Sequence, residues 1–270
     1  MVNVVIDLRP KECYAEGHME GSYSFPWSNI KEESCGLPPR DVTLTALIEK
    51  EMDLHAVEAY LNRFCFASLE VKVFEPSGNL VREVPKTTCW SPNPFLSDSV
   101  PLIESANGGS SLALDVGSGT GRDMVFLASR GWNVIGIENR RRLIDQGVAL
   151  SRKHGVSERV HFLHCDLKEL YPVKNGSVDL LHVCRFLHRP SLRNLLQLPR
   201  KEGKGYLVYS HFLDGCQRTK VGHPSTVAGF FLRGELRQLL ESTGYIILTE
   251  RENILPDGRP LVNIFARRME

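Results

Sequence analysis

The stretch Leu112-Ala-Leu-Asp-Val-Gly-Ser-Gly-Thr-Gly-Arg-Asp123 decides the fold of the larger part of this chain. An apolar run that contains an acid is followed by three glycines at alternate positions, and then by helix-forming residues over 124–130. This order predicts a buried parallel strand that turns sharply into a helix. Because glycine has no Cβ, a ligand can approach the amides of such a turn closely, and the helix N-terminus offers unpaired N–H groups. We therefore expect a ligand-binding loop here.

The spacing of the glycines distinguishes two classes of cofactor. The dinucleotide fingerprint G-x-G-x-x-G requires a third glycine where this chain has Arg122. Gly117, Gly119 and Gly121 instead follow Asp115 in the pattern D-x-G-x-G-x-G. This pattern resembles the first motif of class I S-adenosylmethionine-dependent methyltransferases. The resemblance implies that the three glycines and Asp115 bind S-adenosylmethionine, with the acid serving the ammonium group of its amino-acid end.

A second acid stands where nucleoside-binding folds hold the ribose. The expected strand Asn133–Ile137 delivers Glu138 roughly twenty residues beyond Asp115, the place at which such folds bind both ribose hydroxyls. We expect Glu138 and its neighbour Asn139 to belong to the cofactor site.

A third strand, expected over 160–164, is followed by Asp166 and Leu167. The methyltransferase resemblance implies that Asp166 binds the adenine amino group and that an adjacent backbone amide reads the ring. Asp166 could equally be the N-cap of a short helix that follows it.

The fourth strand is expected over 178–183. The segment that follows it should line the site of methyl transfer, because the carboxyl ends of parallel strands face the ligand crevice. It begins with Cys184, which we count with the cofactor site, and continues through Arg185 and His188 to Arg189. His211 follows the fifth expected strand. For an acceptor that carries a proton, His188 or His211 is the expected general base. For an acceptor that is already an anion, Arg185 or Arg189 would hold it.

The order of elements predicts the fold class. Strands and helices alternate after residue 112, and the chain ends in a strand pair joined by the turn at Asp257-Gly258. This order is typical of a seven-stranded Rossmann-like methyltransferase sheet, and we assign it to residues 86–270. The stretch 76–110 is rich in proline, glycine and polar residues and is expected to be a linker.

The N-terminal part resembles a second family. A strand over 4–8 with Asp7 and Arg9 precedes the turn Gly17-His18-Met-Glu-Gly21. This arrangement resembles the opening of the rhodanese fold, a small α/β domain, which we assign to residues 1–85. The resemblance implies that Asp7 and Arg9 tie the strand end to the turn. His18 is expected to pack in the domain interior rather than to catalyse.

Sulfur transfer is not expected of this N-terminal domain. The rhodanese family uses a cysteine at the head of a loop after a central strand, and the loop expected after strand 44–48 holds Glu49 and Glu51 but no cysteine. Acids there would repel a persulfide anion. Cys35 is followed by an arginine at position 40, but two prolines between them remove the amide donors that such a loop requires.

Composition limits the remaining function classes. The 270 residues carry 33 Lys plus Arg against 32 Asp plus Glu, so the overall charge does not favour nucleic acid as a partner, although a local basic patch is not excluded. Seven cysteines without a C-x-x-C pair favour reduced thiols and a cytoplasmic protein, and no signal peptide, membrane span or metal-ligand pattern is expected.

The predicted function is methyl transfer from S-adenosylmethionine to a small-molecule nucleophile such as a thiol or an oxyanion. The segment Arg-Phe-Leu-His-Arg-Pro over 185–190, taken with the rhodanese-like part, resembles enzymes of the tellurite-resistance and thiol-methyltransferase type. Two alternatives stay open: a methyltransferase for tRNA or protein that docks through the N-terminal domain, and a cofactor-binding regulator without catalysis.

Overall fold

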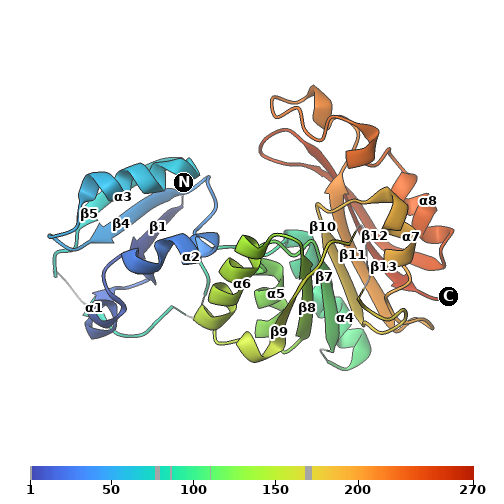
Figure 1. Ribbon diagram of the computed structural model, residues 1–270, viewed down its shortest axis with the longest axis horizontal. Coiled ribbons are helices and arrows are strands. Elements are labelled where there is room, and N and C mark those ends of the chain that lie inside the picture. The colour runs from blue at the N-terminus through green and yellow to red at the C-terminus, as the bar shows by residue number, and fades with distance from the viewer. Residues whose placement is uncertain (1, 77–79, 86, 110, 168–171) are drawn as a thin grey trace. The chain divides into compact units, whose positions relative to one another are not determined.

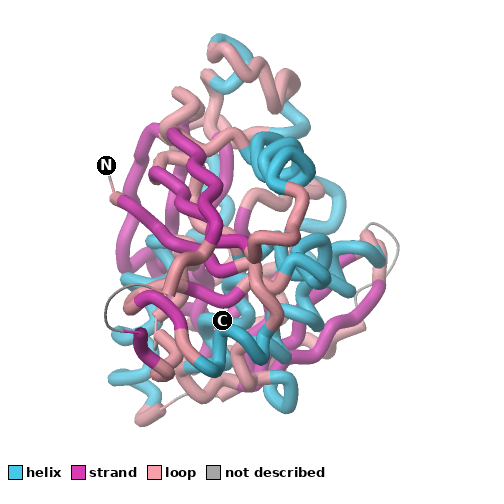
Figure 2. The backbone as a smooth tube through the Cα atoms, turned by 90° about the vertical axis from the view of Figure 1, so that its left-hand side faces the viewer, coloured by secondary structure: helices cyan, strands magenta, loops and turns pink. Residues whose placement is uncertain are grey.

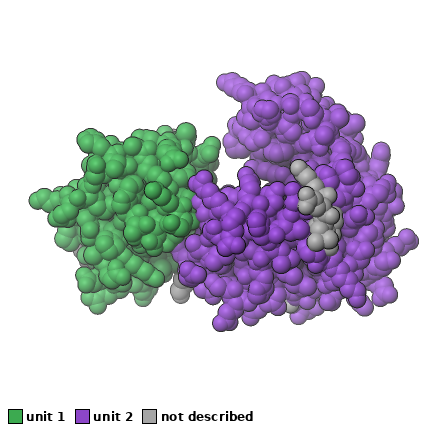
Figure 3. Space-filling view, in the orientation of Figure 1, with its two compact units in different colours: residues 1–91 green, residues 92–270 purple. Residues whose placement is uncertain are grey.

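The computed structural model describes residues 2–76, 80–85, 87–109, 111–167 and 172–270. The chain divides into two compact units, residues 1–91 (unit 1) and residues 92–270 (unit 2), coloured green and purple in Figure 3. This division falls inside the stretch 76–110 that the sequence marks as a linker, somewhat later than the expected domain boundary at residue 85.

Unit 1 is built on a four-stranded parallel sheet with the order β3-β1-β4-β5, and a short antiparallel pair joins β2 to β6. Its strands are β1 (Asn3–Asp7), β2 (His18–Met19), β3 (Tyr23–Ser24), β4 (Thr43–Ile48), β5 (Ser68–Val73) and β6 (Leu80–Val81). Its helices are α1 (Lys11–Glu16), α2 (Ile30–Glu33) and α3 (Leu54–Leu61). β4 is central and almost fully buried, as a parallel strand covered on both faces should be.

Unit 2 contains the expected seven-stranded sheet, with the order β12-β13-β11-β10-β7-β8-β9. Its strands are β7 (Leu112–Val116), β8 (Asn133–Glu138), β9 (Val160–His164), β10 (Leu180–Cys184), β11 (Gly205–Phe212), β12 (Tyr245–Ile254) and β13 (Pro260–Arg268). The first five are parallel, whereas β13 runs antiparallel to both β11 and β12. The sheet is therefore a doubly wound parallel sheet closed at one side by an antiparallel hairpin.

Helices cover both faces of this sheet (Figure 1). They are α4 (Pro94–Asn107), α5 (Arg122–Ser129), α6 (Arg141–Lys153), α7 (Arg189–Leu195) and α8 (Glu235–Glu241). Apolar residues of α4 and α5 form one core cluster with the sheet, and apolar residues of α7 and α8 form another. Strands (magenta) and helices (cyan) can be followed by type in Figure 2. Unit 2 thus has three layers, with the carboxyl ends of the parallel strands left at one edge.

Helix α4 corrects the prediction that residues 76–110 are a linker. Asn93 caps the helix, because its side chain accepts hydrogen bonds from the amides of Phe95 and Leu96 at 2.9 and 3.2 Å, and Pro94 occupies the first turn. Leu96, Val100 and Ile103, at helical spacing, are fully buried. The prolines that made the stretch read as a linker start the helix and interrupt it at Pro101 without ending it.

The short helix that could follow Asp166 falls on residues 168–171, which lie outside the described part of the chain. Within the described residues, no helix has the length and apolarity that crossing a membrane requires.

Candidate active site

The carboxyl ends of β7, β8, β10 and β11 meet at one edge of the unit 2 sheet. β7 is central: the chain leaves it toward β8 and β9 and then returns to β10 on its other side. Ligands of open α/β sheets bind beside such a reversal of strand order, outside the carboxyl ends of the strands. The candidate site therefore lies at the loop after β7.

The glycine loop is a fixed turn. Gly117, Gly119 and Gly121 all have left-handed backbone conformations, with φ of +68°, +56° and +69°. A Cβ at Gly121 would lie 2.7 Å from the ring of Phe162, so both the backbone and the available space require glycine there. The Gly117 amide donates to the Ile137 carbonyl at 2.9 Å, which holds the loop against the end of β8.

Glu138 ends β8 and reaches into this loop. Its side chain is 5% exposed, and its Oε2 accepts a hydrogen bond from the Gly119 amide at 3.1 Å. Oε1 accepts from the Arg140 amide at 2.8 Å. The carbonyl of Asn139 lies 3.0 Å from Nε2 of His164 on β9. The acid expected at the ribose thus lies at the glycine loop, as the sequence spacing requires.

Asp115 is buried below the loop and contacts a residue that sequence analysis missed. Its Oδ1 lies 2.9 Å from Nδ1 of His182, and the two residues are 2% and 0% exposed. His182 stands in an otherwise apolar run, and that pattern indicates a covered strand without marking the histidine as a site residue. The strand register could have found it, since β10 pairs with β7 so that His182 is directly opposite Asp115.

Asn93, which caps α4, and Asp123, in the first turn of α5, lie near the buried pair of Asp115 and His182. The Asn93 amide donates to Asp123 Oδ1 at 2.7 Å, and its side-chain Nδ2 donates to Cys184 Sγ at 3.1 Å. Burial raises the pKa of Cys184 to about 12, and the Asp123 carboxylate adds to the effect. Cys184 is therefore a neutral thiol at the end of β10 and is not a nucleophile at neutral pH.

The two residues after β9 differ in burial. Asp166 is half-buried, whereas the side chain of Leu167 is 3% exposed and belongs to the core beneath the site. The Cys165 amide just before them donates to the Glu138 carbonyl at 3.2 Å, which links this segment to the end of β8.

Arg185 carries a free cation at the edge of the site. Its backbone is left-handed, with φ of +57°, and its amide donates to the Ser210 carbonyl of β11 at 2.8 Å. The guanidinium lies 5.9 Å from the centroid of the Phe212 ring. In the described parts of the chain it has no hydrogen-bond or ion-pair partner. Its charge is available to a ligand.

Arg189 is not available to a ligand, which corrects the prediction that it could hold an anionic acceptor. Its guanidinium forms an ion pair with Glu235 of α8 and donates to the carbonyls of Val227 and Phe230 at 2.9 and 2.6 Å. These bonds attach the loop before α8 to the start of α7. Sequence could not show this, because the partners lie 38 to 46 positions away.

The two predicted histidines lie in different surroundings. Nδ1 of His188 is 2.6 Å from the Ser191 hydroxyl, at the start of α7. His211 of β11 is 3% exposed, and its Nε2 lies 3.0 Å from the Gly229 carbonyl. Because a carbonyl can only accept, Nε2 carries the proton and Nδ1 is left as an acceptor. Burial lowers the pKa of His211 to about 4, so the ring is neutral at physiological pH.

Four buried side-chain atoms along this edge have no hydrogen-bond partner within the described residues. They are Ser118 Oγ in the glycine loop, His182 Nε2 on β10, and Ser210 Oγ and His211 Nδ1 on β11. Buried polar groups are nearly always paired in folded proteins, so their concentration here fits a site for a ligand with polar groups. Together with the glycine loop and Glu138, they fit a nucleoside that carries an amino-acid end.

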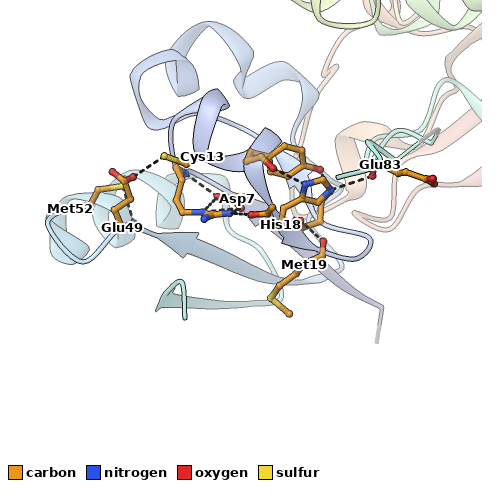
Figure 4. Close-up of polar contacts among 11 residues, drawn as sticks. Asp7, Cys13, His18, Met19, Glu49, Met52 and Glu83 are labelled. Carbon is orange, nitrogen blue, oxygen red and sulfur yellow. Dashed lines mark hydrogen bonds and ion pairs between the residues drawn. The ribbon is translucent and has the colours of Figure 1, made fainter. Parts of the chain in front are cut away.

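The first strand of unit 1 ends in a buried ion pair (Figure 4). Asp7 and Arg9 are 2.7 Å apart, and Arg9 donates to the Gly17 carbonyl at 2.9 Å. The expected tie between the strand end and the turn is therefore present. His18 is fully buried, stacks on Tyr14 at 3.7 Å between ring centroids, and has Nδ1 2.8 Å from the Tyr14 carbonyl. It packs in the interior, as expected.

A cavity of about 360 Å³ opens beside this pair at the carboxyl ends of β1, β4 and β5. Its wall includes Cys13 and the acids Glu16, Glu49 and Glu51. Cys13 Sγ donates to Glu49 Oε1 at 3.5 Å. Burial raises the pKa of the Cys13 thiol, and the bond to Glu49 raises it further. Cys35 belongs to a short turn over 34–36 and does not line the cavity.

Residues 113–201 match the family model described as a methyltransferase domain. The match spans β7 to α7 and so contains the glycine loop, Glu138 and Cys184. No curated protein matches the chain in a sequence search.

Solved structures with the same fold include methyltransferases. A S-adenosylmethionine-dependent methyltransferase from Methanosarcina mazei is 20% identical, with a TM-score of 0.51 over 63% of this chain and 97% of that one. The magnesium protoporphyrin IX methyltransferase from Synechocystis PCC 6803, solved with bound S-adenosylhomocysteine, is 18% identical, with a TM-score of 0.51 over 65% and 81%. The [4+2]-cyclase SpnF is 16% identical, with a TM-score of 0.51 over 64% and 80%.

At these identities the structural likeness establishes the fold and not the reaction, as the cyclase illustrates. The family match supplies the chemistry that the fold alone does not, and it falls on the segment where the glycine loop and Glu138 form the candidate site. Residues 113–201 therefore match a methyltransferase domain, and the protein is an enzyme.

Proposed function

We propose that unit 2 transfers the methyl group of S-adenosylmethionine to a small nucleophile that is an anion at neutral pH. The observation that carries this proposal is the guanidinium of Arg185 at the end of β10, which has no described ion-pair partner, together with the buried His211, whose low pKa of about 4 makes it a poor base. The Synechocystis neighbour is named for a small-molecule acceptor, which is consistent with this class of substrate.

The cofactor site would be formed by the residues that the sequence identified. The amides of Gly117, Gly119 and Gly121 line the turn, and Glu138 would bind the ribose hydroxyls in place of its present bond to Gly119. Asn139, Asp166 and the Leu167 backbone would surround the adenine. Asp115 would not contact the amino-acid end of the cofactor directly, because its side chain is buried against His182 beneath the glycine loop.

When bound, S-adenosylmethionine supplies a sulfonium whose methyl carbon is attacked in line by the acceptor. The acceptor would form a bond to the methyl carbon while the carbon–sulfur bond breaks, and the electron pair of that bond would stay on sulfur as the neutral thioether of S-adenosylhomocysteine. The chain's own residues provide position and charge. The most direct contribution is that of Arg185, which would hold the acceptor near the end of β10.

His211 would contribute a hydrogen-bond acceptor rather than a base. Its Nδ1 lone pair is buried and unpartnered among the described residues, and its pKa of about 4 makes it a weak base at neutral pH. His188 is bonded to Ser191 at the start of α7, and we assign it to orienting the loop that carries Arg185. An acceptor that is already an anion needs no base, which is why soft oxyanions and acidic thiols are the preferred substrates.

Unit 1 is proposed to be rhodanese-like and without sulfur transfer. The order of its parallel strands, the tie between Arg9 and Gly17, and the buried His18 support the resemblance. The loop after β4 brings Glu49 and Glu51 to the cavity, where they would repel a persulfide anion.

Formation of S-adenosylhomocysteine from S-adenosylmethionine tests the proposed reaction. The purified chain would be incubated with small thiols, carboxylates and inorganic oxyanions, including tellurite, and in parallel with total tRNA and with protein extract. We expect turnover with members of the first group, and a raised KM for the acceptor in Arg185→Gln. Turnover only with tRNA or protein would overturn the small-molecule assignment.

A further inference from the structure

His182 stands under the glycine loop without a role in the proposed reaction. It is the middle residue of β10, is fully buried, and donates or shares a proton with Asp115 across a 2.9 Å contact. The two residues are paired directly in the register of neighbouring parallel strands. A charged or strongly polar pair in the centre of a parallel sheet is costly to bury, so it calls for a reason beyond packing.

The other nitrogen of His182 faces a second acid. Nε2 lies 3.8 Å from Oδ2 of Asp123 and has no hydrogen-bond partner within the described residues. Asp123 is in the first turn of α5, directly after the glycine loop, whereas Asp115 stands directly before it. The imidazole therefore lies between the two acids that flank the loop.

The contacts of Asp123 extend this arrangement to the start of α4. Its Oδ1 accepts from the amide of Asn93 at 2.7 Å, and Asn93 caps α4 while its side chain donates to Cys184 Sγ at the end of β10. The ends of β7 and β10 and the starts of α4 and α5 are thus joined through one group of polar side chains, of which Asp115 and His182 are buried and Asn93 and Asp123 are partly exposed. All four segments border the candidate cofactor site.

The charges around the ring favour a protonated imidazole. Burial opposes the charge, but the carboxylate of Asp115 and then that of Asp123 outweigh it, so the pKa of His182 is raised above its ordinary value. On the same strand as His182, Cys184 is neutral, and the residue opposite His182 on β11 is the apolar Val208. From β8 the carboxylate of Glu138 adds negative charge near Asp115.

We propose that His182 is a positioning residue for the cofactor: its protonated ring holds Asp115 and Asp123 in place at the two ends of the glycine loop, so that cofactor affinity depends on its protonation. This inference rests on the proposed cofactor site. When the ring loses its proton, the buried carboxylate of Asp115 and the partly exposed carboxylate of Asp123 lie on either side of it without a cation between them, and their repulsion separates the ends of the loop. Cofactor binding then weakens as the pH rises through the pKa of His182.

Calorimetric titration with S-adenosylhomocysteine between pH 6 and pH 9 tests this inference on the full chain. The variants are His182→Gln, Asp123→Asn and, as a matched control, His161→Gln, which changes an exposed histidine of β9. Ionisation of the ligand is common to all four proteins and cancels in the comparison. We expect the wild type and the control to lose affinity at least tenfold toward the alkaline end. His182→Gln should bind at least tenfold more weakly at pH 6 and show a flatter profile than the control.

Asp123→Asn distinguishes positioning from a general loss of structure. Removing one carboxylate lowers the pKa of His182, so the pH midpoint of ligand binding should move to lower pH while the affinity at pH 6 is largely kept. An unchanged midpoint in Asp123→Asn, or equal pH profiles for His182→Gln and the control, would overturn the inference. Absence of binding by the wild type at every pH would instead refute the proposed cofactor site itself, which separates the two failures.

Discussion

Glu138 and Gly119 are joined by a hydrogen bond between the ends of two neighbouring strands. The carboxylate of Glu138, at the end of β8, accepts this bond from the amide of Gly119, the central glycine of the loop after β7, at 3.1 Å. The same carboxylate accepts the Arg140 amide at 2.8 Å. A charged group that is 5% exposed keeps such an orientation only because backbone donors hold it. These backbone donors therefore fix the position of the Glu138 carboxylate beside the glycine loop, at the proposed cofactor site.

Replacement of Glu138 should weaken cofactor binding, and the loss of affinity should be larger for alanine than for glutamine. Hydrogen bonds to a charged group contribute ~1.5–3 kcal/mol, so we expect Glu138→Ala to bind S-adenosylmethionine about 10- to 100-fold more weakly. Glu138→Gln keeps one acceptor and should lie between the wild type and Glu138→Ala. Equilibrium dialysis measures both, with Glu158→Gln, an exposed acid, as control. Equal affinity of Glu138→Ala and the control would contradict the ribose assignment.

Substitution of Arg185 should affect binding of the acceptor, whereas substitution of Arg189 should affect stability. Arg185 has no described ion-pair partner, so Arg185→Gln should raise the KM for the acceptor and leave the midpoint of urea unfolding unchanged. Arg189→Gln leaves Glu235 and two carbonyls without their donor. It should lower the free energy of unfolding by ~1–3 kcal/mol. Finding the stability loss in Arg185→Gln instead would show that the two assignments are reversed.

The buried neutral His211 should make unit 2 less stable in acid. Its pKa is about 4 in the folded chain and about 6.5 when exposed, so between these values the unfolded state binds the extra proton and stability falls as the pH falls. The wild type should lose ~2–3 kcal/mol relative to His211→Asn between pH 7.5 and pH 4.5, by 1.36 kcal/mol per unit of pKa difference. Urea unfolding at the two pH values measures this, and a constant difference would show that His211 is not buried as a neutral ring.

Unit 1 should not transfer sulfur. The lining of the cavity at the ends of its parallel strands contains three acids as well as Lys50 and the paired Arg9, and the thiol of Cys13 that faces Glu49 has a raised pKa. We expect no thiocyanate from thiosulfate and cyanide, and unchanged methyl transfer in Cys35→Ser and Cys13→Ser. Thiocyanate formation that disappears in either variant would contradict the assignment of unit 1.

The sequence predicted the parallel strands of unit 2 well because most of them are short, largely apolar runs, although β9 contains two histidines. β9 has the expected bounds, and β8 ends at the expected acid, Glu138. Helix α4 was not predicted because its prolines are also typical of linkers, although Pro94 suits the first turn of a helix and only Pro101 lies in its interior.

The misassigned and missed site residues depend on contacts between distant positions. Arg189 reads as a free cation until the fold brings Glu235 to it, and His182 reads as one polar residue in a covered strand until the register places Asp115 opposite. The acid–base character of His211 follows from burial, which a local pattern does not reveal. Spacing along the chain predicted the residues that lie on one loop or one strand end, but not the pairs that form between elements.

Calorimetric titration of the purified chain with S-adenosylmethionine, S-adenosylhomocysteine and the nicotinamide dinucleotides at neutral pH tests the central claim most directly. The glycine loop with Arg122 in place of a third glycine, together with Glu138, predicts micromolar binding of the two sulfur nucleosides and none of the dinucleotides. Binding of a dinucleotide without binding of either sulfur nucleoside would contradict the account.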